Sequence, residues 1–312
     1  MISSAQPIKL IVIGGYLGSG KTSLLNHILT HSRGKRITVL VNDFGQINID
    51  AALIARRTQE VIALANGCIC CTIGGELATA LIRLGTATAR PEYLIIESSG
   101  VSNPGKIAQI GLLDKTYELD SIVVTVDAER IDQHLQDPYV GDMVAQQIRA
   151  AHLLLINKID LIDSATKQKR IGLLKTVSGR QRLIETVNGA IAPELFFSPD
   201  FAPGARPEPF SRLADKPLSR VASFSVTTGD FPDKAQLERN LKSLPNEVLR
   251  AKGIVYFAAD PRAFSVQVVG HRVAIKPVAV GADMARVSVL VFIGLQETMD
   301  QSGIESLIRH CD

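Results

Sequence analysis

Gly15-Tyr-Leu-Gly-Ser-Gly-Lys-Thr22 stands between an apolar run at residues 8–13 and a segment of helical period at 22–30. The stretch fits the pattern GxxxxGK[ST], in the strand–loop–helix context that this pattern requires. In such a loop the glycines let backbone N–H groups surround phosphate oxygens, and the helix N-terminus adds its dipole. The alternative is a glycine-rich turn without a ligand. The complete pattern and its flanks favour a nucleotide phosphate site.

The side chains of this loop have distinct expected roles. Lys21 is expected to reach the β- and γ-phosphates, and the Thr22 hydroxyl is expected to hold magnesium. The predicted cofactor-binding residues of the loop are Gly15, Gly18, Ser19, Gly20, Lys21, Thr22 and Ser23.

Short β-branched runs alternate with segments of helical period through the first two-thirds of the chain. The runs are almost continuously apolar, as in strands that are buried on both faces of a parallel sheet. This rhythm predicts an α/β fold of the P-loop NTPase kind, with a doubly wound, mostly parallel sheet that binds ligands at the carboxyl ends of its strands. The predicted strands are 8–13, 37–41, 93–96, 122–126 and 153–156, and the predicted helices are 22–30, 77–85 and 143–149.

The 312 residues are about twice the length of a usual domain, so we expect two domains. Residues 201–217 contain four prolines and no clear period, which predicts a linker. The first domain is therefore placed at 1–200. A smaller C-terminal α+β domain is placed at 218–312, with mainly antiparallel strands because its connections are short. Its predicted strands are 221–226, 254–258, 264–269 and 287–293, and its predicted helices lie near 233–243 and 301–309.

A second motif, Asn157-Lys158-Ile-Asp160, follows the apolar run at 153–156. The Asp160 carboxylate can accept hydrogen bonds from N1 and N2 of guanine, a pair of donors that adenine lacks. Buried polar groups left unpaired make this kind of discrimination large. Asn and Asp after a strand also form ordinary turns, so the tetrapeptide alone is weak evidence. Its place after a strand, downstream of the phosphate loop, predicts GTP as the nucleotide.

Glu97-Ser-Ser-Gly100 ends another apolar run. A carboxylate there can hold magnesium through water, and the Gly100 N–H can sense the γ-phosphate. The alternative is a polar exit from a strand. The predicted catalytic residues are Lys21, Thr22, Glu97 and Gly100. Val101 follows Gly100 and cannot position a water as glutamine would, so we expect slow intrinsic hydrolysis.

Asn66-Gly-Cys68-Ile-Cys70-Cys71 places three thiols within four positions. Adjacent Cα atoms lie ~3.8 Å apart, below the usual disulfide range of ~4.4–6.8 Å, so a Cys70–Cys71 disulfide would be strained. Three thiolates suit zinc, cobalt or copper(I) and leave a fourth position open for transfer. A redox switch and inert buried cysteines are the alternatives. Asp43, after the second strand, can add an oxygen ligand or simply cap a turn.

Together these motifs resemble the CobW-like P-loop GTPases, which act as metallochaperones or metal-insertion factors. The resemblance covers nearly the whole chain. It implies GTP binding by the loop, metal binding at Cys68, Cys70 and Cys71, and hydrolysis coupled to metal transfer to a client metalloprotein. The residues that carry it are 15–22, 42–45, 67–71, 97–100, 157–160, 249–253 and 291–294.

The chain departs from that family in three places. Asn42-Asp43-Phe-Gly-Gln46 replaces the usual Asn-Glu-Phe-Gly-Glu, which weakens the expectation of an acidic metal ligand there. Glu97-Ser-Ser-Gly100 replaces Glu-Thr-Thr-Gly and keeps the carboxylate and the glycine. The His-rich tract that many members carry is missing, and the histidines present are scattered.

Composition excludes several other classes of protein. The net charge is +3 and the pI is near 8.6, and the basic residues are dispersed. The chain therefore lacks the concentrated basic patch that is typical of nucleic-acid binding proteins. No apolar run approaches the ~18 residues of a membrane span, and the N-terminal apolar stretch runs into the glycine loop as a first strand, unlike a signal peptide. Cys311 is expected to be an ordinary residue. We therefore expect a cytoplasmic protein that binds neither nucleic acid nor membrane, and a homodimer is left open.

The leading hypothesis is a GTP-hydrolysing metallochaperone. Magnesium–GTP would order the loops at Asp43 and Gly100 and bring the cysteine loop into a metal-binding shape, and hydrolysis would release the metal. The alternative is a GTP-gated regulatory switch that senses metal or redox state without delivering metal. A small-molecule kinase with structural cysteines is a third hypothesis, against which residues 157–160 argue, because guanine-specific kinases are uncommon.

Overall fold

The computed structural model describes residues 6–32, 34–41, 60–63, 73–179, 182–197, 221–270, 272–278, 280, 286–295 and 298–309. The chain divides into two compact units, Met1–Pro193 and Glu194–Asp312. The predicted linker at 201–217 lies outside the described residues. So do Asp43, Cys68, Cys70 and Cys71.

The first unit is built on a seven-stranded sheet in the order β3-β2-β4-β1-β5-β6-β7. Every neighbouring pair is parallel, which confirms the predicted α/β class. The strands are β1 (Ile8–Gly14), β2 (Ile37–Val41), β3 (Glu60–Ala63), β4 (Tyr93–Glu97), β5 (Tyr117–Asp127), β6 (Leu153–Asn157) and β7 (Leu183–Glu185).

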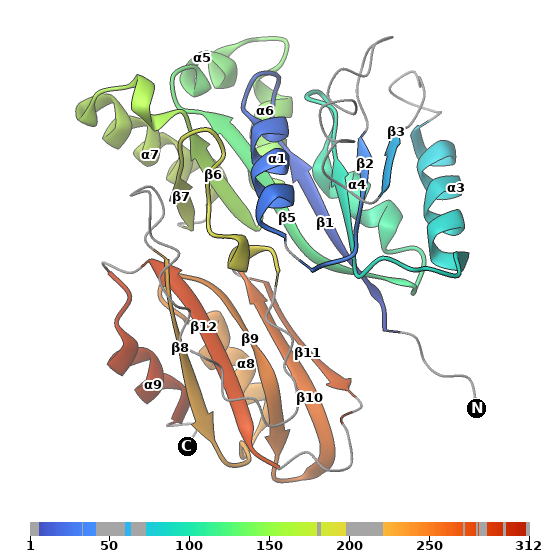
Figure 1. The fold of residues 1–312 in the computed structure, drawn as a ribbon. Helices are drawn as coiled ribbons and strands as arrows, with labels where there is room; N and C mark the ends of the chain where they lie inside the picture. The colour runs from blue at the N-terminus through green and yellow to red at the C-terminus, as the bar shows by residue number, and fades with distance from the viewer. Residues whose placement is uncertain are drawn as a thin grey trace. The chain divides into compact units, whose positions relative to one another are not determined.

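Helices cover the sheet because its central strands are apolar on both faces. Helix α1 packs against β1 and β4 and lies in front of the strands in Figure 1, and α4 packs against β1 and β5. Leu10 and Val12 of β1 share a core cluster with Ile107 and Ala108 of α4. The helices are α1 (Lys21–His31), α3 (Ile73–Thr86), α4 (Pro104–Gly111), α5 (Ile131–Gln136), α6 (Gly141–Ala150) and α7 (Ser164–Ser178), with the short helices η1 (Ile159–Leu161) and η2 (Pro193–Leu195).

Strand register brings polar residues together at one edge of this sheet. Glu97 at the end of β4 is in register with Val41 on one side and with Ile13 on the other. Asp127 at the end of β5 is in register with Asn157 at the end of β6. The carboxyl ends of these parallel strands therefore meet at the edge where ligands bind in such sheets.

Several elements of this unit were not predicted. Strands β3 and β7 are too short to show a period. Helix α7 fully buries only Leu174, with Ile171 and Val177 partly buried beside it, so its apolar stripe is narrow. Helix α4 did have a signal, because Asn103 precedes Pro104 and its side chain accepts hydrogen bonds from Gly105 N and Lys106 N.

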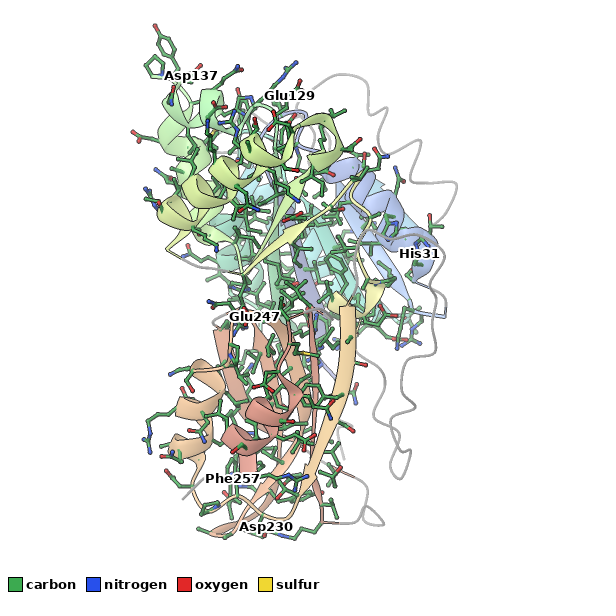
Figure 2. All side chains as sticks on the ribbon, turned by 90° about the vertical axis from the view of Figure 1, so that its left-hand side faces the viewer. His31, Glu129, Asp137, Asp230, Glu247 and Phe257 are labelled. Atoms are coloured by element: carbon green, nitrogen blue, oxygen red, sulfur yellow. The ribbon has the colours of Figure 1, made fainter. Side chains whose placement is uncertain are left out.

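The second unit is an antiparallel five-stranded sheet in the order β11-β10-β9-β12-β8, as expected of an α+β domain. Two helices complete its core, in which Leu237 and Ile304 cluster with Phe292 of the sheet. Asp230 and Phe257 lie at one end of this sheet (Figure 2). The elements are β8 (Val221–Thr228), α8 (Lys234–Lys242), β9 (Val248–Phe257), β10 (Asp260–Val269), β11 (Arg272–Val278), β12 (Ser288–Leu295) and α9 (Gln301–Arg309).

Helix length and polarity also bear on membrane crossing. Across the parts of the chain that the structure describes, we find no helix with the length and apolar character that a bilayer span demands.

Candidate nucleotide site

A cavity of about 560 Å³ opens at the carboxyl edge of the parallel sheet. This volume falls within the ~300–1,000 Å³ typical of small-molecule sites. The phosphate-loop residues that line it are Gly18, Gly20, Lys21, Thr22 and Ser23. Glu97, Gly100, Asn157, Lys158 and Asp160 line it too. The structure therefore brings the three predicted nucleotide motifs together around one space.

Two positions of the phosphate loop accept only glycine. Gly15 has φ 136°, and a Cβ there would lie 2.3 Å from the carbonyl oxygen of Thr125. Gly20 has φ 100°, and a Cβ there would lie 2.1 Å from Asn157 Nδ2. L-residues rarely adopt such conformations, and neither position has room for a side chain. The loop is thus held in one shape by its neighbours.

Two predicted loop residues, Gly15 and Ser19, are not among those that line the cavity. Ser19 is buried, and its hydroxyl lies 2.7 Å from Thr125 Oγ1. Its side chain fastens the loop to β5. Ser19 is therefore better explained as support for the loop than as a side-chain ligand.

Helix α1 starts at Lys21 and points its N-terminus at the cavity. Its N-cap is Gly20, and among the described residues no side chain caps this end. The first N–H groups of a helix have no partner inside the helix and suit an anion. The first turn is therefore available to phosphate oxygens.

Thr22 and Glu97 bring two side-chain oxygen groups together beside the loop. The Thr22 hydroxyl donates a hydrogen bond to Glu97 Oε1 at 3.1 Å, and Glu97 is only 4% exposed. Magnesium prefers hard oxygen ligands such as hydroxyl and carboxylate groups. This donor set, next to Lys21, fits a magnesium ion.

The loop after β4 is fixed from two sides. A Cβ on Gly100 would lie 2.9 Å from the backbone nitrogen of Leu17, so this loop lies against the phosphate loop. On the other side, Gln147 of α6 donates from Nε2 to Gly100 O at 3.0 Å and to Ser102 O at 2.8 Å. Gln147 is 1% exposed. Its side chain therefore sets the position of the segment that contains Gly100.

At the other end of the cavity, Asn157 joins two loops. Its Nδ2 donates to Ser19 O, and its Oδ1 accepts from Gly189 N, both at 3.0 Å. Lys158 has φ 63°, and its Nζ donates to Asp127 Oδ2 at 2.6 Å. A strained lysine held by a buried carboxylate indicates a fixed position beside the cavity.

Asp160 lies on the short helix η1 and is exposed at the cavity wall. Asn188, on the loop after β7, shares this end of the cavity. An exposed carboxylate on the wall is available to a ligand's N–H groups. Asp160 thus lies on the wall of the cavity, and its guanine-binding role stays a prediction.

Family models match most of the chain. Residues 9–185 match the CobW/HypB/UreG nucleotide-binding domain, and residues 221–312 match the cobalamin synthesis protein cobW C-terminal domain. The chain belongs to the CobW/HypB/UreG family. The resemblance inferred from its motifs is thereby confirmed.

Curated relatives of this CobW-family chain are named for zinc. It is 29% identical to "Zinc chaperone CobW" of Sinorhizobium sp over 96% of both chains. It is also 29% identical to "Zinc chaperone YjiA" of Escherichia coli K12, over 93% of this chain and 95% of the relative. "Zinc-regulated GTPase metalloprotein activator 1" of Schizosaccharomyces pombe is 36% identical over 61% of this chain and 48% of the relative.

A solved structure of Zn(II)-bound YjiA GTPase from E. coli is also similar to the CobW-family chain. The match covers 98% of this chain and 99% of that chain, at 21% identity and a TM-score of 0.43.

The metal motif of this CobW-family protein stays a prediction. Cys68, Cys70, Cys71 and Asp43 lie outside the described residues. Among the residues that are described, no group of three or more His, Cys, Asp and Glu side chains could hold a metal ion.

Some residues of the CobW-family site were missed by the sequence analysis. Asn188 adopts φ 53°, a conformation that asparagine tolerates, and the Asn188-Gly189 dipeptide is a turn signal that could have indicated it. Gln147 carried no signal, because its partners lie more than forty residues away in sequence. Leu17, Val41 and Leu161 also line the cavity and are ordinary apolar residues in sequence.

Proposed function

We propose that this chain is a GTPase metallochaperone that binds a transition metal, with zinc or cobalt as the expected ion, and passes it to a client metalloprotein. One observation carries the proposal. A single cavity joins the phosphate loop, the Thr22–Glu97 oxygen pair and the Asn157-Lys158-Ile-Asp160 motif. The family of the chain and the relatives named GTPase and zinc chaperone support it.

In the proposed reaction Lys21 and the N-terminus of α1 bind the phosphates. Magnesium, when bound at Thr22 and through water at Glu97, supplies positive charge to the phosphate oxygens. The Gly100 N–H, on a loop held by Gln147, responds to the γ-phosphate. Val101 offers no group that orients water, so the intrinsic rate is slow.

Base selection is assigned to the other end of the cavity. Asp160 accepts from N1 and N2 of guanine, and Lys158 is held beside it through Asp127. Asp160→Asn replaces one acceptor oxygen with an amino group, which opposes the guanine donors. We expect the affinity for GTP and GDP alike to fall by about 100-fold, because polar groups of the shared guanine base are left mismatched. Fluorescent GDP titration measures this, and unchanged affinity would remove the guanine assignment.

The cargo ion is assigned to Cys68, Cys70 and Cys71. These cysteines follow β3, whose carboxyl end lies at the same sheet edge as the nucleotide cavity because all strands are parallel. For release to depend on hydrolysis, metal affinity must differ between the GTP and GDP states. We place the chain in the cytoplasm, where closely spaced thiols stay reduced.

Metal content after anaerobic purification tests this assignment. We expect about one thiolate-bound transition-metal ion per chain in the unaltered protein, since three thiolates form one site. Cys70→Ser should abolish most of it, and the control Cys311→Ser should not. Equal metal content in the Cys70→Ser variant would refute the cysteine site while leaving GTP binding intact.

A further inference from the structure

Two histidines lie one turn apart on α1, away from the residues that line the nucleotide cavity. The ring centroids of His27 and His31 are 4.3 Å apart, at an interplanar angle of 37°. His27 is half-buried, and His31 is exposed at the surface of the first unit (Figure 2). Residues at i and i+4 share one face of a helix, which is the spacing of helical histidine metal ligands.

Hydrogen bonds fix which nitrogen of each ring carries the proton. His27 Nε2 lies 2.8 Å from the carbonyl oxygen of Ile191, and His31 Nδ1 lies 2.8 Å from the carbonyl oxygen of His27. A carbonyl oxygen only accepts, so both of these nitrogens must donate. In a neutral imidazole the other nitrogen then has a lone pair. The lone pairs are therefore on His27 Nδ1 and His31 Nε2.

We propose that His27 and His31 form a second, surface metal site that takes a zinc ion through His27 Nδ1 and His31 Nε2, with water completing the coordination. Imidazole is the commonest protein ligand of such ions. Metal-binding histidines usually donate their other N–H to a carbonyl or carboxylate. Both rings already make that supporting bond.

The spacing of the two rings is compatible with this site. A tetrahedral zinc ion about 2.0–2.1 Å from each nitrogen holds the two ring centroids roughly 5 Å apart. The observed 4.3 Å is close to this value.

This site does not depend on the cysteine loop, so it can be tested without it. The test titrates zinc alone into full-length protein carrying Cys68→Ser, Cys70→Ser and Cys71→Ser, by calorimetry. Two further variants in that background add either His31→Ala or Thr30→Ala. Thr30 is the matched control, because it is exposed on the same turn and leaves both rings in place.

We expect one zinc equivalent in the background and in the Thr30→Ala variant. His31→Ala should weaken binding by at least ~10-fold, since it removes one of two protein ligands. Identical isotherms for the His31→Ala and Thr30→Ala variants would overturn the site, and so would a background that binds no zinc.

Ring-nitrogen NMR gives an independent readout that does not rely on a variant. In the metal-free protein His27 should be protonated at Nε2 and His31 at Nδ1. Added zinc should shift His27 Nδ1 and His31 Nε2 together. The opposite tautomers, or shifts confined to other histidines, would overturn the proposal.

Discussion

The two units bury polar side chains for different purposes. In the parallel unit, Glu97 and Asn157 are buried at strand ends and their partners belong to loops that line the cavity. In the antiparallel unit, Arg250 is fully buried and donates to the carbonyl oxygens of Leu195 and Phe196. Asn240 similarly donates to Leu307 O. Burial alone therefore does not indicate function, and the location of the partner does.

The largest effect is expected from Gly20→Ala in the parallel unit. Its Cβ would lie 2.1 Å from Asn157 Nδ2, and Asn157 is held by both Ser19 O and Gly189 N. Because Asn157 cannot yield, the loop must distort, and we expect nucleotide affinity to fall by ~100-fold or more. Fluorescent GDP titration measures it.

Gly179→Ala is the matched control for that change. Gly179 also has positive φ, at 59°, but open space surrounds its Cβ position at the end of α7. The strain should cost about 1 kcal/mol of stability and leave nucleotide affinity unchanged. Similar affinity losses in the two variants would show that the loss follows general destabilisation and not the contact between Gly20 and Asn157.

Arg250→Met addresses the antiparallel unit. The change removes the donor to two buried carbonyl oxygens, those of Leu195 and Phe196. The free energy of unfolding of this unit should therefore fall by about 2–4 kcal/mol. Nucleotide affinity should stay within about twofold. Chemical denaturation beside GDP titration checks both, with the exposed Arg239→Met as control. A large loss of affinity would give Arg250 a functional role.

Gln147→Met tests whether a buried side chain of the parallel unit affects GTP hydrolysis by positioning a loop. The change keeps volume but removes both hydrogen bonds to the Gly100–Ser102 segment. We expect kcat for GTP to fall about 10-fold with little change in GDP affinity, because our proposal places only the γ-phosphate against that segment. The adjacent Gln146→Met is exposed and should have no effect. Equal loss of GDP affinity would mean that Gln147 acts on the whole site.

The smallest effect is expected from an exposed ion pair in the antiparallel unit. Hydrogen bonds from Arg262 lower the pKa of Asp260 to about 2. Because the pKa of Asp260 is lower in the folded protein than its ordinary value of 3.8, the ionised carboxylate stabilises the folded state above pH 3.8. This stabilisation is lost as the pH falls toward about 2 and the carboxylate is protonated. Asp260→Asn should therefore destabilise slightly at pH 7 and not at pH 2. If Asp260→Asn destabilised an Arg262→Gln variant equally at pH 7, the hydrogen bonds from Arg262 would not be the cause of the lowered pKa.

Motifs and long apolar runs could be predicted from sequence because their causes are local. Strand β2 and helix α9 were predicted at the observed bounds, since apolar period alone defines them. Strand β5 extends back to Tyr117, beyond the predicted start, because polar residues such as Asp120 interrupt the apolar run and are nevertheless buried. Gln147 and Asp127 were missed because their roles arise from contacts made only in the fold.

The central claim is that the terminal phosphate of GTP controls metal affinity, and one titration tests it most directly. Zinc is titrated into the full-length protein bound to magnesium with either a non-hydrolysable GTP analogue or GDP. We predict tighter zinc binding with the analogue by about tenfold or more, a coupling of about 1.4 kcal/mol. Equal dissociation constants in the two nucleotide states would contradict the account.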